Sequence, residues 1–133
     1  QRQVFHGALV WTAHRVGLKA DLTLVENLRF EAALRPQGGD SLEKVLERLE
    51  ITRLKPLPLR SLSAGQQRRV ALARMLLADV PLWLMDEPFT NLDREGRVLV
   101  MQLVKEHLDT GGMCVMAAHQ DIEIDAPVRK VVL

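Results

Sequence analysis

Short apolar runs alternate along the chain with stretches whose apolar residues recur at helical spacing. The runs predict buried strands at 8–13, 81–85, 113–118 and 128–133. The helical spacing predicts helices over about 23–34, 41–49, 63–78 and 94–108. Strands that alternate with helices in this way favour an α/β fold built on a parallel sheet.

The predicted helices have recognisable start and stop signals. Residues 23–26 and 63–66 have the spacing of capping boxes, in which two side chains bind backbone amides of the first helical turn. Asp40 or Ser41 can cap the helix between them. Gly111 and Gly112 are expected to end the helix over 94–108.

Composition limits the class of protein. The chain has 133 residues, of which 47% are hydrophobic and 26% charged, and this suits one globular domain. A formal net charge of +1 gives no reason to expect nucleic acid as a partner. No apolar run approaches the length that crosses a bilayer. Because residue 1 is not Met and no leader pattern follows it, we expect the sequence to begin inside a longer one.

Several side chains are expected to be structural. The single Cys114 excludes an internal disulfide and a cysteine-based zinc cluster, and its apolar strand predicts that it is a buried packing residue. Trp83 lies in another apolar run and is expected in the core. His107 is expected to face solvent.

The segment 62–66 (Leu-Ser-Ala-Gly-Gln) combines features that favour phosphate. A helix start presents free amides and the positive end of the helix dipole. Ser63 adds a hydroxyl, and Gly65 lets an anion approach the backbone closely. An ordinary helix cap is the alternative interpretation.

A second set of polar residues follows two of the predicted strands. Asp86 and Glu87 end the strand over 81–85, and His119 ends the next one. Ligands in parallel α/β proteins bind at the carboxyl ends of the strands. An aspartate there suits Mg²⁺, and an adjacent glutamate can orient or deprotonate a water molecule. The alternatives are an acidic turn and a structural histidine.

Taken together and in this order, four segments resemble the nucleotide-binding domain of ABC ATPases. Residues 62–66 resemble its signature motif, 86–87 its Walker B carboxylates, 91–93 its D-loop and His119 its switch histidine. The resemblance implies a P-loop NTPase type of α/β fold with a parallel-sheet core, truncated at the N-terminus, and a helical signature subdomain. It divides the chain into a core strand with the Q-loop region (1–22), the helical and signature subdomain (23–78), and the remaining core strands (79–133).

The resemblance implies a role for the signature segment between two subunits. Ser63 and Gly65 would contact the γ-phosphate of ATP held by a second ATP-binding subunit, and Ala64 and Gln66 would belong to the same ATP-binding segment. Ala64 stands where glycine is commoner in the family, but the Gly65 amide is retained.

The resemblance also implies roles for the strand-end residues. Asp86 would support Mg²⁺, Glu87 would polarise the attacking water, His119 would bind the γ-phosphate, and Asp93 would link two ATP sites across a dimer. The family's Q-loop glutamine falls on His14, which puts a Mg²⁺ role for this position in doubt.

A narrower resemblance is to the ATP-binding subunits of haem-exporter complexes in cytochrome c maturation. It is carried by His14, by 17–28, by 62–74 and by 82–90 with its Asp-Glu-Pro-Phe-Thr segment. It implies an integral membrane transporter subunit as partner. It also implies a peripheral location on the cytoplasmic face of the inner membrane, or the matrix side in mitochondria.

Two parts of an ABC ATPase are absent from the sequence. No lysine follows glycine in a P-loop pattern, and there is no Tyr to stack on adenine. We expect both parts to precede residue 1 and the chain alone to be inactive. A degenerate, non-hydrolytic domain that acts as a structural or regulatory partner is the alternative. An ATPase head of the DNA-repair type is disfavoured, because the helix over 41–50 is too short for a coiled coil.

Overall fold

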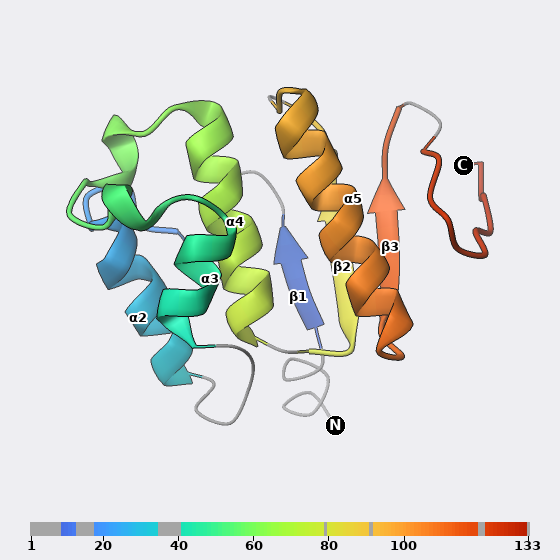
Figure 1. The fold of residues 1–133 in the computed structure, drawn as a ribbon, viewed down its shortest axis with the longest axis horizontal. Coiled ribbons are helices and arrows are strands. Elements are labelled where there is room, and N and C mark those ends of the chain that lie inside the picture. The colour runs from blue at the N-terminus through green and yellow to red at the C-terminus, as the bar shows by residue number, and fades with distance from the viewer. Residues whose placement is uncertain are drawn as a thin grey trace.

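Three parallel strands form one sheet, and their carboxyl ends meet at a single edge. The computed structural model describes residues 9–12, 18–34, 41–78, 80–90, 92–119 and 122–132. The strands are β1 (Leu9–Thr12), β2 (Leu82–Asp86) and β3 (Met113–Ala117), side by side in the order β1-β2-β3. In the register, Thr12 lies opposite Met85 and Asp86 lies opposite Ala117. The strand arrows in Figure 1 therefore point the same way.

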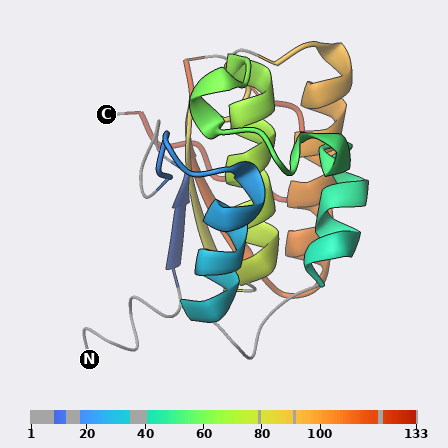
Figure 2. The same ribbon diagram turned by 90° about the vertical axis from the view of Figure 1, so that its left-hand side faces the viewer.

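The helices lie on one side of this sheet (Figure 2). They are α2 (Leu24–Leu34), α3 (Leu42–Arg48), α4 (Ala64–Ala78) and α5 (Arg94–Asp109), with short 3₁₀ turns at η1 (Thr52–Leu54) and η2 (Leu59–Ser61). The alternation of strands and helices confirms the predicted α/β class. Within the described ranges, no helix is both long enough and apolar enough to cross a membrane.

The predicted helix starts are confirmed at the level of hydrogen bonds. In the box at α4, the Gln66 amide donates to Ser63 Oγ (3.1 Å) and the Ser63 amide donates to Gln66 Oε1 (2.9 Å). The start of α2 is capped in the same sense by Thr23, whose Oγ1 accepts the Glu26 amide at 3.1 Å. Ser41 caps α3. Local sequence therefore sets where each of these helices begins.

The core fills the space among the helices and between them and the sheet. From β2 it contains Trp83 and Met85, which confirms the prediction for Trp83. The helices contribute fully buried leucines, valines and a methionine: Leu24, Leu28, Val45, Leu46, Val70, Met75, Val100 and Val104. Leu24 and Leu28 lie four residues apart, as do Val100 and Val104, which is why the helical pattern was readable from the sequence.

His107 is partly buried, whereas the sequence suggested a solvent-facing side chain. Its ring stacks on Trp83, with 3.9 Å between the ring centroids and 3° between the planes. Its Nε2 atom lies 3.1 Å from the carbonyl oxygen of Pro81 and 3.2 Å from that of Met113. One imidazole at the end of α5 therefore holds the starts of both β2 and β3.

The strand predicted at 128–133 is wrong for residues 128–132, which form no strand. Val128, Val131 and Val132 are exposed there. An apolar run becomes a strand only where a neighbouring strand accepts and donates its backbone hydrogen bonds. The segment runs past β3 in Figure 1 without pairing with it. Met113 and Val115 on β3 are likewise exposed.

Candidate active site

Glu87 and His119 lie together at the carboxyl edge of the sheet. Each follows one of two paired strands, β2 and β3, so the register brings them to the same place. His119 Nε2 is 3.2 Å from Glu87 Oε1. The histidine side chain is 94% exposed and the glutamate 35%. A group bound from outside could therefore contact both side chains.

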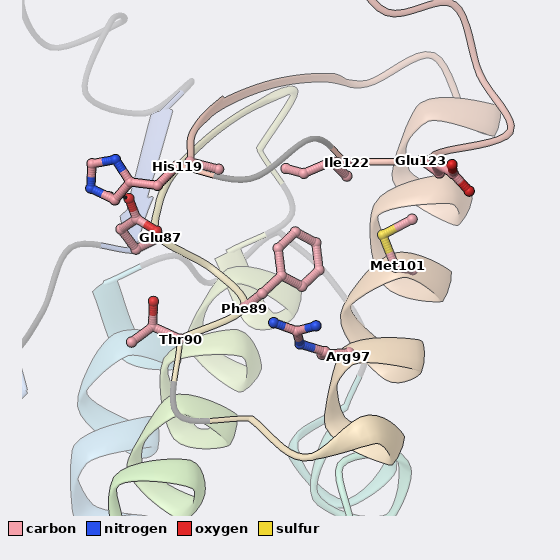
Figure 3. Close-up of a pocket in the computed structure, with 9 residues that line it drawn as sticks. Glu87, Phe89, Thr90, Arg97, Met101, His119, Ile122 and Glu123 are labelled. Carbon is pink, nitrogen blue, oxygen red and sulfur yellow. Dashed lines mark ion pairs between the residues drawn. The ribbon is translucent and has the colours of Figure 1, made fainter.

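The pair lines a cavity of about 380 Å³ between the ends of the strands and α5. Figure 3 shows His119 beside Glu87, with Phe89 next to them and Arg97 and Met101 projecting from α5. Thr90, Ala118, Ile122 and Glu123 complete the lining. An apolar floor with a few charged groups is typical of small-molecule sites.

Asp86 is exposed at the last position of β2. Among the described residues, no group of three or more His, Cys, Asp or Glu side chains is arranged to hold a metal ion. Mg²⁺, however, is usually bound through one or two carboxylates, with water and substrate phosphates as its other ligands. The exposed Asp86 carboxylate beside Glu87 fits that kind of site.

The start of α4 presents hydrogen-bond donors to solvent. Ser63 and Ala64 are exposed, and within the described ranges no acceptor binds the Ala64 or Gly65 amide. The Ser63 hydroxyl accepts the Gln66 amide and still has a proton that it can donate to another acceptor. The Gln66 side chain binds the Ser63 amide and helps to fix this geometry. Two amides, a hydroxyl and a helix dipole suit an anion such as phosphate.

Asp93 has a local role that sequence reasoning missed. Its carboxylate caps α5 by accepting the Gly96 amide at 2.7 Å. A Cβ atom at Gly96 would lie 3.0 Å from the same carboxylate oxygen, so a larger residue there would require that oxygen to shift by a few tenths of an ångström. His14 and Asn91 lie outside the described residues.

Arg68 is a site residue that sequence reasoning did not identify. It lies in α4 and is 8% exposed, and its Nη2 donates to the carbonyl oxygen of Glu87 at 2.6 Å. Burial lowers the pKa of Arg68, while the charges of Asp86 and Glu87 act in the opposite direction. The spacing of the helix could have identified it, because Arg68 lies four residues before Leu72 and seven before Met75, on the same buried face of α4.

Comparison with known proteins adds relatives of similar sequence. The ABC transporter family profile matches residues 1–90. The chain is 41% identical over 132 residues to the cytochrome c biogenesis ATP-binding export protein CcmA of Methylococcus capsulatus, covering 98% of the chain and 64% of that protein. It is 43% identical to CcmA of Nitrosospira multiformis, covering 90% of the chain and 59% of that protein. The chain thus spans less than two thirds of the length of these relatives.

Solved structures show the same fold. The dimeric ATP-binding cassette MJ0796, in a post-hydrolysis state bound to ADP and Pi, aligns with 90% of the chain and 55% of its own length. The TM-score is 0.76 and the sequence identity 27%. The fold, the order of the motifs and a profile match over 90 of 133 residues agree, and the chain belongs to the ABC transporter family.

Proposed function

We propose that these residues are part of the ATP-hydrolysing subunit of an ABC transporter that serves haem delivery in cytochrome c maturation. The observation that carries the proposal is the contact between Glu87 and His119 at the carboxyl ends of paired parallel strands. The start of α4, with its open amides, lies at the same end of the molecule (Figure 1). The similarity to CcmA proteins supports the choice of transporter.

The residues suit in-line attack of water on a phosphorus atom. The Glu87 carboxylate would orient the water and take up its proton, while His119 would donate a hydrogen bond to the γ-phosphate. Both side chains reach solvent and lie 3.2 Å apart, so one bound phosphate can contact the two of them. Asp86 would hold Mg²⁺ directly or through water. The metal ion, when bound with ATP, would neutralise charge that develops on the phosphate oxygens.

The proposal requires partners. Ser63 and Ala64 are exposed, and the donors at Ser63, Ala64 and Gly65 would bind ATP held by a second ATP-binding subunit. The MJ0796 cassette is dimeric, which is consistent with this arrangement. An integral membrane transporter subunit would be the other partner, on the cytoplasmic face of the inner membrane. The near-neutral charge gives no reason to add nucleic acid.

The test uses the complete gene product assembled with its membrane partner. Mg²⁺-dependent ATP turnover is measured for the wild type, for Glu87→Gln and for Glu95→Gln, which changes an exposed carboxylate in α5. Loss of a general base lowers turnover by about a hundredfold or more. We expect Glu87→Gln to lose turnover and holo-cytochrome c formation, and Glu95→Gln to retain both. Normal holo-cytochrome c formation with Glu87→Gln would instead favour the degenerate, non-hydrolytic domain.

A further inference from the structure

The backbone at Glu87 adopts a conformation that its sequence does not favour. Its φ angle is +48°, in the left-handed region that non-glycine residues rarely occupy. Pro88 follows it, and a proline restricts the preceding residue further toward extended conformations. Such a conformation persists only where the surrounding structure holds it in place. The turn after β2 therefore needs an external restraint.

Hydrogen bonds supply that restraint from three directions. The Glu87 amide donates to the carbonyl oxygen of Ala117 on β3 at 2.8 Å. The Glu87 carbonyl oxygen accepts the Thr90 amide at 3.2 Å and the Arg68 guanidinium at 2.6 Å. Two of these bonds are made by backbone groups that almost any sequence provides. Of the side chains described, Arg68 is the one that binds the Glu87 backbone.

Arg68 is well placed to act as a rigid support. Its side chain projects from α4, whose first turn is fixed by the Ser63–Gln66 capping box, and it is buried against the end of β2. A charge-assisted hydrogen bond is stronger and geometrically stricter than one between neutral groups. Its cation also lies near the Asp86 and Glu87 carboxylates and offsets their mutual repulsion.

We propose that Arg68 is a positioning residue for the reaction assigned to Glu87: it holds the Glu87 backbone so that the carboxylate faces His119. The effect of Arg68 on ATP hydrolysis rests on the proposed function, whereas its effect on the Glu87 backbone does not. Without Arg68 the turn relaxes toward an ordinary backbone conformation, and the carboxylate loses its alignment with the bound phosphate. A misplacement of about 1 Å in a catalytic group can lower the rate about a hundredfold.

Arg69 provides a matched control on the same helix. It is also largely buried, and its Nη1 donates to a backbone carbonyl oxygen, that of Leu49, at 2.8 Å. That contact joins α4 to the end of α3 and does not involve the turn after β2. Arg68→Met and Arg69→Met therefore each remove one guanidinium that binds a backbone carbonyl oxygen, and Arg69→Met also removes the 3.7 Å ion pair with Glu50. Arg68→Lys keeps a cation that can donate a hydrogen bond, so it still tests the inference if Arg68→Met fails to fold.

The first measurement is hydrogen exchange of the complete gene product, which needs no ATPase activity. We expect faster exchange of the Glu87 and Thr90 amides in Arg68→Met, with α5 unchanged, and wild-type exchange there in Arg69→Met. In Arg68→Lys, the exchange rates of these two amides should lie between those of the wild type and those of Arg68→Met. Wild-type exchange at the turn in Arg68→Met would overturn the inference, whatever the protein's activity.

The second measurement is steady-state ATP hydrolysis by the complex with the membrane partner. We expect Arg68→Met to lower kcat about ten- to a hundredfold with KM for ATP nearly unchanged, and Arg68→Lys to recover part of the loss. A purely structural role would lower the amount of folded protein and leave kcat per folded molecule unchanged, which would contradict the inference. Absence of hydrolysis in the wild type would instead overturn the proposed function, while the exchange result still tests the turn.

Discussion

Replacing Glu31 with glutamine removes one half of a buried ion pair that joins α2 to α4. Glu31 Oε1 lies 2.6 Å from Arg74 Nε, and the two side chains are 9% and 18% exposed. The substitution conserves size and shape, so the packing of the two helices is retained. What changes is the charge, because the carboxylate 2.6 Å from the Arg74 cation is replaced by a neutral amide in a place that water reaches poorly.

The expected cost follows from the burial of the pair. Removing one partner of a buried ion pair destabilises proteins by about 3–5 kcal/mol. Because Arg74 keeps some exposure, we expect the lower end, about 3 kcal/mol for Glu31→Gln. With a urea dependence of about 1–3 kcal/mol per molar, the unfolding midpoint should fall by about 1–3 M. Replacing both residues by apolar ones, as Glu31→Leu with Arg74→Met, should cost less than the single change.

Urea unfolding followed by far-ultraviolet circular dichroism tests this expectation. Glu43→Gln is the control, since it breaks the surface pair between Glu43 and Lys55, which is worth at most about 1 kcal/mol. The reasoning is wrong if Glu31→Gln loses no more stability than Glu43→Gln. It is also wrong if the double variant loses as much as the sum of Glu31→Leu and Arg74→Met measured separately.

Three further predictions concern other parts of the chain. Glu50 follows the C-cap residue Leu49 of α3 and has φ +58°, so Glu50→Gly should raise the free energy of unfolding by about 0.5–1 kcal/mol in urea titrations. His107→Ala should lower it by about 1–3 kcal/mol, and His107→Phe by less, because Phe keeps the stacking on Trp83. Burial raises the pKa of Cys114 to about 11. Iodoacetamide should therefore label the Cys114 thiol far more slowly in the folded protein than in the unfolded one. Because the unfolded thiol ionises at a lower pH than the folded one, the free energy of unfolding should fall as the pH rises from about 8.5 toward 11.

The helices could be predicted because their signals are local. Ser63 and Gln66 lie three residues apart and form the expected capping box. The apolar face of α3 follows directly from the spacing of Val45, Leu46 and Leu49. Neither result depends on where the rest of the chain lies.

The errors concern contacts between distant segments. The run at 128–133 has the composition of a strand, but residues 128–132 form no ladder with β3. His107 gave no sign of its stacking on Trp83, which lies 24 positions earlier in the sequence. Hydrophobic pattern gives the tendency of a segment, whereas its partners are set by the tertiary fold.

Only part of the candidate site was predictable, because some of its features depend on strand ends and others on contacts between distant segments. Glu87 and His119 could be placed at one edge because parallel strands end together, and their 3.2 Å separation agrees with that placement. The left-handed backbone at Glu87 and its bond to Arg68 could not be foreseen, because both arise where α4 packs on the end of β2.

The most direct test of the central claim is a single-turnover measurement on the complete gene product with its membrane partner. ATP binding and release of inorganic phosphate are followed in the wild type and in Glu87→Gln. We expect the variant to bind ATP as tightly as the wild type but to release phosphate at about one hundredth of the wild-type rate or less. Equal rates of phosphate release would contradict it, because the carboxylate beside His119 would then have no part in the reaction.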